Sequence, residues 1–161
     1  MLDPQTLGDH LDRLFRAAWA LCGSREDAED LVQTTYTRVL ARPRLLRNDD
    51  DLGYLMRALR NTFFSERRSA ARRPRAVADP EALDLPDPRA GAAEPAAAAE
   101  AREVYAAIAA LPAKARDVIV AVDVAGLTYG EAGEALRVGE GTVASRLARA
   151  RSDVAKSLSQ P

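Results

Sequence analysis

The chain has 161 residues and a formal net charge of −1, and 47% of its residues are hydrophobic but only 5% aromatic. This length suits one ordinary domain or two small ones. Cys22 and His10 are the only cysteine and histidine, which excludes an intramolecular disulfide and a Cys-based zinc site, so we expect no metal and no other cofactor.

The charges are segregated along the chain although their sum is close to zero. Residues 65–75 hold five arginines against one glutamate, residues 76–100 hold six acids against one arginine, and residues 137–156 hold five basic residues against two acids. Alanine-rich composition with scattered Arg and Glu favours helices, and we predict an all-α protein. The two basic segments are candidates for binding nucleic acid.

The first helical block covers residues 1–73. Apolar residues recur at steps of three and four up to Trp19, which predicts an amphipathic helix that ends near Gly23. The Ser24 hydroxyl can accept a hydrogen bond from a first-turn amide of a second helix, and we expect that helix to end near Ala41. A third apolar stripe follows, formed by Leu52, Leu55, Met56, Leu59 and Phe63. These patterns predict a small domain of three helices.

Residues 74–95 form an acidic segment with five prolines and without helical periodicity, which predicts a flexible Pro/Ala-rich linker. A second helical block covers residues 96–161. In it, Pro112 suits the first turn of a helix that we expect Val118, Ile119, Val122 and Val124 to pack. Thr128 and Glu131 then form a capping box, and the turn VGEG leads into the last helix. Two short helices joined by a turn with glycine are the outline of a helix-turn-helix.

The last helix has two different faces. Val143, Leu147, Ala150 and Val154 share one apolar face, and the opposite face carries hydroxyl and guanidinium groups. Arginine can grip phosphate or bind guanine edges, and Ser or Thr can serve either role, so this face suits the major groove of DNA. The competing interpretation is an ordinary solvated helix with arginine for solubility. A phosphate-binding loop at GEG is excluded, because no strand precedes it and no Lys-Ser or Lys-Thr follows.

Both blocks also resemble one protein family. The segments GSREDAEDLVQTTYTRVL and LGYLMRALRNTFFSERRSAARR are similar to the first conserved domain of extracytoplasmic-function (group IV) sigma factors of bacterial RNA polymerase. The segment GLTYGEAGEALRVGEGTVASRLARAR resembles their second domain, which reads the minus-thirty-five element. The resemblance therefore implies sigma domain 2 in residues 1–73, a linker in 74–95 and sigma domain 4 in 96–161.

The resemblance and the residue chemistry together give three candidate sites. The family places the contact with RNA polymerase on Asp30, Gln33, Thr34, Tyr36 and Leu40. A basic track suited to single-stranded promoter DNA consists of Arg57, Arg60, Asn61, Arg67 and Arg68. Within it, Asn61 matches a family position implicated in reading the minus-ten element. The minus-thirty-five duplex would contact Thr142, Ser145, Arg146 and Arg149. Phe63 continues an apolar stripe, so we expect it in the core.

The resemblance implies a sigma factor that binds the beta and beta-prime subunits of core polymerase and directs promoter-specific initiation, with a stress or envelope regulon and an anti-sigma factor as a further partner. The sequence shows no catalytic constellation, so we expect no enzyme and no small-molecule substrate. It also lacks a signal peptide and an apolar run that could span a membrane, which predicts a cytoplasmic protein with no membrane partner.

Several residues depart from the family pattern. Arg137 stands where a glycine is expected, which costs on the order of 1 kcal/mol if its φ is positive, unless Gly139 takes up the turn. Gly133 should weaken its helix by about 1 kcal/mol relative to Ala. Ala144 replaces a basic residue of the family, and Thr34 stands where the family often has Glu. We therefore expect a less stable DNA-binding module with one contact fewer.

Two other classes of protein remain open at this point. A helix-turn-helix regulator would share the C-terminal module, but it should dimerise and bind palindromic duplex without polymerase. A helical adaptor or inhibitor that imitates a sigma factor would not need the arginines between Arg67 and Arg73.

Overall fold

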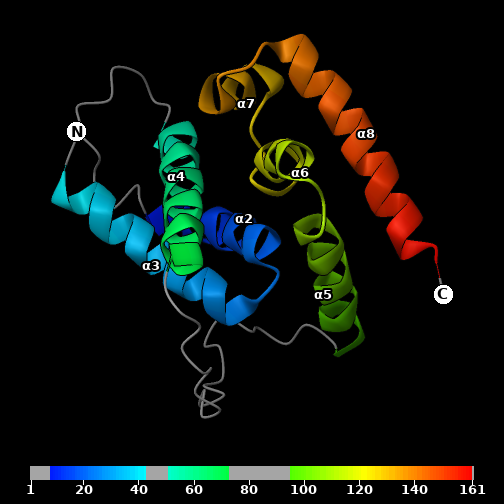
Figure 1. The fold of residues 1–161 in the computed structure, drawn as a ribbon, viewed down its shortest axis with the longest axis horizontal. Helices are drawn as coiled ribbons and strands as arrows, with labels where there is room; N and C mark the ends of the chain where they lie inside the picture. The colour runs from blue at the N-terminus through cyan, green and yellow to red at the C-terminus, as the bar shows by residue number, and fades with distance from the viewer. Residues whose placement is uncertain (1–7, 43–50, 73–94, 161) are drawn as a thin grey trace.

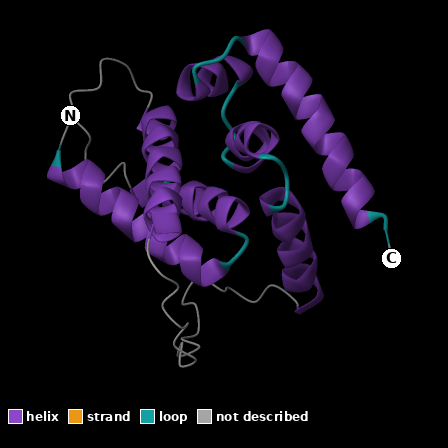
Figure 2. Cartoon of the chain, in the orientation of Figure 1, coloured by secondary structure: helices purple, strands orange, loops and turns teal. Residues whose placement is uncertain are grey.

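The computed structural model describes residues 8–42, 51–72 and 95–160, and helices are the regular secondary structure of those ranges (Figures 1 and 2). In chain order they are α2 (Leu11–Cys22), α3 (Arg25–Ala41), α4 (Asp51–Arg72), α5 (Pro95–Ala109), α6 (Ala113–Ile119), the π-helix η1 (Val120–Val124), α7 (Tyr129–Leu136) and α8 (Glu140–Leu158). None of the helices in these ranges is both long and apolar enough to cross a membrane.

Local signals end α2 and begin α3 where the sequence predicts it. Gly23 has a φ of 75°, and its N–H donates to the Trp19 carbonyl at 2.7 Å. This left-handed conformation favours glycine, which has no Cβ. The Ser24 hydroxyl accepts a hydrogen bond from the Asp27 amide at 3.4 Å, so the predicted N-cap is confirmed.

Apolar periodicity sets how α2, α3 and α4 pack. The side chains that face inward from α3 are Ala28, Leu31, Val32, Thr35 and Val39, all of them buried. Thr35 satisfies its hydroxyl by donating to the Leu31 carbonyl at 2.7 Å. On α4, Leu55 and Leu59 are fully buried, and each such leucine contributes about 1.5–3 kcal/mol through burial.

The helix after Pro112 does not continue as a regular α-helix. The Ala125 amide donates to the Val120 carbonyl at 2.9 Å, a bond that spans five residues and defines the π-turn η1. The extra residue rotates the end of this helix, so Val120 and Ala121 are buried whereas Val122 and Val124 are only half-buried. The prediction that Val122 and Val124 pack this helix is therefore right only in part.

The helix-turn-helix is formed by α7 and α8. The predicted capping box is present, because the Glu131 amide donates to the Thr128 hydroxyl at 3.2 Å and the Thr128 amide donates to the Glu131 carboxylate at 2.7 Å. Arg137 takes the left-handed turn itself, with φ 57° and ψ 46°, while Gly139 has a φ of −71° and caps α8. The turn therefore carries the backbone strain of about 1 kcal/mol.

The two groups of helices share one core. In Figure 1, α2, α3 and α4 lie on one side and α5 to α8 on the other. α2 contacts both α5 and η1, and α4 contacts α7. The Trp19 ring of α2 lies against the Tyr105 ring of α5, with 5.1 Å between the centroids. The predicted linker lies outside the described residues, except for Pro95, where α5 begins.

Candidate nucleic-acid and polymerase interfaces

The predicted recognition helix is α8, and its buried face consists of Val143, Leu147, Ala150 and Val154 as expected. The remaining side of its first turns carries Ser145 and Arg149, which are exposed, and Thr142 and Arg146, which are half-buried. The Ser145 hydroxyl donates to the Thr142 carbonyl at 3.2 Å. The helix thus presents two guanidinium groups and two hydroxyl-bearing side chains on one side, a set that can bind phosphates and base edges.

Arg151 has a different role from the other arginines of α8. Its Nε lies 2.8 Å from Asp123 Oδ2 and its Nη2 lies 2.6 Å from Asp123 Oδ1, which is bidentate pairing. This hydrogen bonding raises the pKa of Arg151 above its usual range. The pair ties α8 to η1, so Arg146 and Arg149 are the arginines of α8 left as candidates for contact with DNA.

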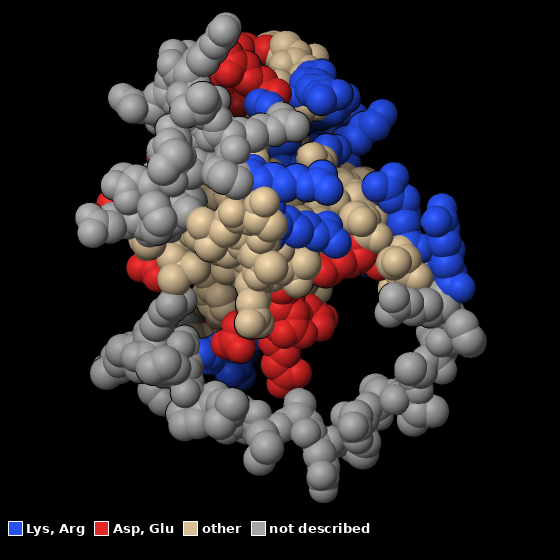
Figure 3. All heavy atoms as spheres, turned by 90° about the vertical axis from the view of Figure 1, so that its left-hand side faces the viewer, with Lys and Arg blue, Asp and Glu red and all other residues tan. Residues whose placement is uncertain are grey.

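On α4, Arg57 and Asn61 line a hollow of about 480 Å³. Tyr54 lines it from the same helix, Arg38 lines it from α3, and Arg42 lines it from the position directly after α3. Arg137 also reaches this hollow, from the turn between α7 and α8. The described lining contains four arginines and no carboxylate. On the α3–α4 side of the molecule, Figure 3 shows Lys and Arg in adjacent blue patches, above a group of red carboxylates near the centre.

The other arginines of the predicted track differ in their surroundings. Arg60 pairs with Asp117 of α6 at 2.8 Å and lies over the Phe64 ring at 4.9 Å. Arg67 lies over the Phe63 ring at 5.0 Å, and both Arg67 and Arg68 are exposed. Phe63 itself is 5% exposed, so its predicted place in the core is confirmed. Arg73, which follows the track in sequence, lies outside the described residues.

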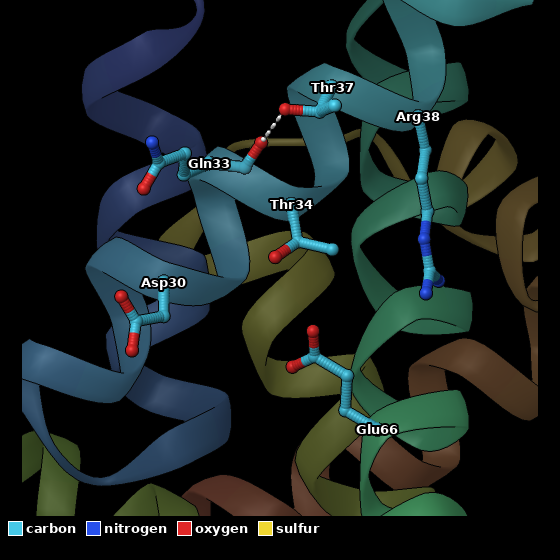
Figure 4. Close-up of a pocket in the computed structure, with 6 residues that line it drawn as sticks. All are labelled: Asp30, Gln33, Thr34, Thr37, Arg38 and Glu66. Atoms are coloured by element: carbon cyan, nitrogen blue, oxygen red, sulfur yellow. Dashed lines mark hydrogen bonds between the residues drawn. The ribbon is translucent and has the colours of Figure 1, made fainter.

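Three of the predicted polymerase-contact residues border one hollow on α3. Asp30, Gln33 and Thr34 line it, together with Thr37, Arg38 and Glu66 (Figure 4). The Thr37 hydroxyl donates to the Gln33 carbonyl at 2.9 Å. Glu66 comes from α4, and its carboxylate points toward Thr34 in the close-up. No local sequence pattern points to Glu66, because only packing of α4 on α3 brings it to this surface.

Tyr36 and Leu40 lie outside this hollow. Tyr36 is half-buried and packs against the core, whereas Leu40 is 52% exposed at the end of α3. A large apolar side chain that is half exposed beside polar neighbours suits a protein contact. The five predicted residues thus fall into a polar hollow and an adjoining apolar end of the same helix.

Cys22 gives a pH-dependent prediction. Burial, followed by the nearby carboxylates of Asp27 and Glu66, raises the pKa of Cys22 to about 12. Because the thiolate is the nucleophile, iodoacetamide should alkylate the native protein slowly at about pH 8, and the rate should keep rising with pH. The same thiol in urea should reach a plateau just above its ordinary pKa of about 8.5. A plateau near that pH in the native protein would contradict the burial of this group.

Comparison with known families defines the class of protein. Sigma-70 region 2 matches residues 7–73, and Sigma-70 region 4 matches residues 101–154. The solved structure of the sigma factor RpoE in complex with the anti-sigma factor NepR, from Bartonella quintana, superposes with a TM-score of 0.72 at 24% identity and covers 96% of this chain and 94% of RpoE. CnrH, in complex with the cytosolic domain of CnrY, gives 0.64 at 24% identity and covers 96% and 85%. At this identity the likeness shows the fold.

Sequence relatives then give the family. The chain is 33% identical over 153 residues to the ECF RNA polymerase sigma factor SigE of Mycolicibacterium smegmatis, covering 88% of this chain and 56% of SigE. It therefore spans little more than half the length of that relative. It is 32% identical over 144 residues to the ECF RNA polymerase sigma factor EcfG of Rhodopseudomonas palustris, covering 88% and 76%. The chain belongs to the ECF RNA polymerase sigma factors.

Proposed function

We propose that this chain binds core RNA polymerase and directs it to start transcription at particular promoters. One observation carries the proposal: the chain matches region 2 and then region 4, in that order. The region 2 match contains the α3 hollow, and the region 4 match contains the cationic side of α8. A helix-turn-helix regulator would need α8 to bind DNA, but it would not need the polar and apolar surface on α3 for contact with polymerase.

The three candidate sites then have separate tasks. The polymerase is bound by Asp30, Gln33 and the exposed Leu40. The family often has Glu at the position of Thr34, and in this chain Glu66 supplies a carboxylate beside Thr34. Arg57, Asn61 and the arginines that follow on α4 hold the single-stranded minus-ten element, since a basic track with stacking groups binds single strands. The polar face of α8 contacts the minus-thirty-five duplex through Thr142, Ser145, Arg146 and Arg149.

Further parts of the proposal go beyond the family itself. We place the protein in the cytoplasm with the polymerase, and we place the boundaries of its two domains at residues 73 and 96, joined by the acidic linker. RpoE and CnrH were each solved with a regulatory partner, NepR or CnrY. By analogy, this chain has an anti-sigma factor that releases it in response to a stress or envelope signal.

Run-off transcription with purified core polymerase and a library of promoter fragments tests the proposal. The wild-type chain should give specific starts. An Asp30→Ala/Gln33→Ala double variant should lose them together with binding to core, because the α3 contact is removed. An Arg146→Ala/Arg149→Ala double variant should lose minus-thirty-five-dependent starts but still bind core, since each lost arginine contact costs about 1–3 kcal/mol.

Asp12→Ala/Arg13→Ala is a matched control, because it removes one acid and one base from exposed positions of α2. This variant should transcribe like the wild type. Absence of starts and of core binding, together with binding of palindromic duplex by the protein alone, would overturn the proposal in favour of a regulator.

A further inference from the structure

A hollow of about 480 Å³ lies where α3, α4 and the turn between α7 and α8 meet. Four arginines from separate parts of the chain line it, and its described lining contains no carboxylate. We call it the arginine hollow, after Arg38, Arg42, Arg57 and Arg137. Small-molecule pockets in proteins commonly have volumes of about 300–1,000 Å³, so the arginine hollow has the size of a ligand site.

The guanidinium groups of the arginine hollow have no counter-charge from the described part of the chain. Within residues 8–42, 51–72 and 95–160, none of the four arginines takes part in an ion pair. Like charges that share one hollow repel each other, and an anion that enters the hollow relieves this repulsion. The arginine hollow therefore favours an anionic ligand over a neutral one.

One of these arginines also has an unsatisfied hydrogen-bond donor. The Nε atom of Arg57 is buried, and it has no hydrogen-bond partner within the described residues. A buried donor without an acceptor is unfavourable, and a bound ion or water is a common reason for it in native proteins. Phosphate oxygens are suitable acceptors, because they form charge-assisted hydrogen bonds with guanidinium groups.

Arg137 reaches the arginine hollow from a backbone conformation that arginine rarely adopts. It has a φ of 57° and a ψ of 46°, in the left-handed region that favours glycine. Gly139, two residues later, has a φ of −71° and does not take over the turn. Residues in such conformations cluster at ligand sites, where the side chain has a task. The guanidinium group that Arg137 brings to the hollow gives arginine such a task at this position.

The amount of charge in the arginine hollow indicates the kind of anion. A phosphate diester of a DNA strand has a single negative charge, whereas a terminal phosphate group has about −1.5 to −2 at neutral pH. Two or three linked phosphate groups therefore present several charges within a small volume. Guanidinium groups gathered in one hollow match such an anion better than they match one phosphate of a strand.

We propose that the arginine hollow binds a compact polyphosphate anion, either the di- or triphosphate group of a nucleotide or inorganic pyrophosphate. The four arginines bind the phosphate oxygens. For a nucleotide, the Tyr54 ring and the Asn61 amide, which also line the hollow, can stack on the base and bind its edge. Arg38, Arg42 and Arg137 have no part in the proposed function, so this site goes beyond it.

Two residues of the arginine hollow are shared with the proposed strand-binding track. They are Arg57 and Asn61, so a bound polyphosphate and the promoter strand compete for them. This consequence rests on the strand-binding role proposed for α4, whereas the polyphosphate site itself does not. Titrations of the free chain without polymerase therefore test the site separately from the proposed function.

Isothermal titration calorimetry of the full chain at low salt, with inorganic pyrophosphate as the ligand, tests the site. Pyrophosphate should bind roughly tenfold more tightly than inorganic phosphate, because it reaches more than one guanidinium group. ADP is the second ligand. Tighter binding of ADP than of pyrophosphate would assign the site to nucleotides, and equal binding would assign it to the diphosphate group alone. Both results support the site.

Arg137→Gly removes one guanidinium group and gives the turn the residue that its φ favours, so this variant should fold. Its affinity for pyrophosphate should fall roughly tenfold, as expected when one charge-assisted hydrogen bond is lost. Arg42→Gln should have a similar effect from the end of α3. Arg102→Gln is the matched control, because Arg102 is exposed on α5 and does not line the hollow. It should bind pyrophosphate like the wild type.

Urea unfolding gives a second readout. Saturating pyrophosphate should raise the unfolding midpoint of the wild type and of Arg102→Gln, because a ligand that binds only the folded chain stabilises it. The rise should be smaller in Arg137→Gly and in Arg42→Gln. Affinity and midpoint shifts that neither variant lowers would overturn the inference, since the anion would then not bind in the arginine hollow.

Equal binding of pyrophosphate and phosphate by the wild type would also overturn the inference. The competing occupant is DNA, tested with a fluorescein-labelled single strand of about 12 nucleotides. If Arg137→Gly and Arg42→Gln weaken binding of this strand while pyrophosphate does not bind, the hollow serves DNA and the inference is wrong. Failure of run-off transcription would count against the proposed function alone, because the titrations with pyrophosphate involve neither polymerase nor promoter.

Discussion

Gly133→Ala should destabilise the protein, by about 2 kcal/mol in urea unfolding, although alanine is the better helix former. A Cβ at this position would lie 2.8 Å from the Val138 carbonyl oxygen. That oxygen belongs to the backbone of the helix-turn-helix turn. The Val138 amide of the same turn donates a hydrogen bond to the Gly133 carbonyl of α7 at 2.9 Å. The turn must therefore shift, and α8 shifts with it. This contact predicts the opposite sign from the sequence-based expectation, in which Gly133 weakens its helix relative to alanine.

Gly141→Ala is the matched control for this substitution, because a Cβ there has nothing within 4 Å. Gly141 lies in the first turn of α8, so alanine should raise the free energy of unfolding by up to about 1 kcal/mol. The same chemical change, eight residues apart, should thus have opposite signs. Equal stabilisation by both substitutions would show that the turn can yield around Gly133.

Leu147→Ala should lower the free energy of unfolding by about 2–5 kcal/mol. Leu147 is 1% exposed and lies on the apolar face that fixes α8 to α6, so the substitution leaves a cavity behind the proposed DNA-binding surface. Binding of a promoter fragment by the polymerase complex should fall as well, because the arginines lose a firm scaffold. Chemical denaturation and run-off transcription measure the two effects.

Arg149→Ala tests the proposed DNA contact of α8 without disturbing how the helix packs. The residue is exposed, so its removal should change stability by no more than about 0.5 kcal/mol. It should nevertheless weaken minus-thirty-five binding by about 1–3 kcal/mol. A loss of stability comparable to that of Leu147→Ala would mean that Arg149 is a structural residue.

The helix ends and buried faces could be predicted from the sequence because local interactions determine them. Gly23, Ser24 and the Thr128–Glu131 box each act within four residues, and they are found where the sequence places them. Helical periodicity likewise predicted the buried face of α8. Such features depend on propensities and spacing, which a single sequence displays directly.

The features that the sequence could not predict depend on packing between distant segments. Arg60 and Asp117 are 57 residues apart, and Arg151 and Asp123 are 28 apart, so neither pair has a local signature. Glu66 reaches the α3 hollow only through the crossing of α3 and α4. Charge segregation located the basic segments of the chain, but it did not distinguish arginines that remain open to DNA from arginines that pair with carboxylates.

The π-turn η1 also constrains how this family member can vary in length. It adds one residue to the helix that continues from α6. Each residue added to or removed from a helix rotates the rest of that helix by about 100°. Val120 and Ala121 face the core on one side of the surplus residue, and Asp123 reaches Arg151 on the other. Insertions and deletions are tolerated in surface loops, but here a change of one residue would put one of these two contacts out of register. The spacing between Ile119 and Gly126 is therefore expected to be fixed among functional variants of this chain.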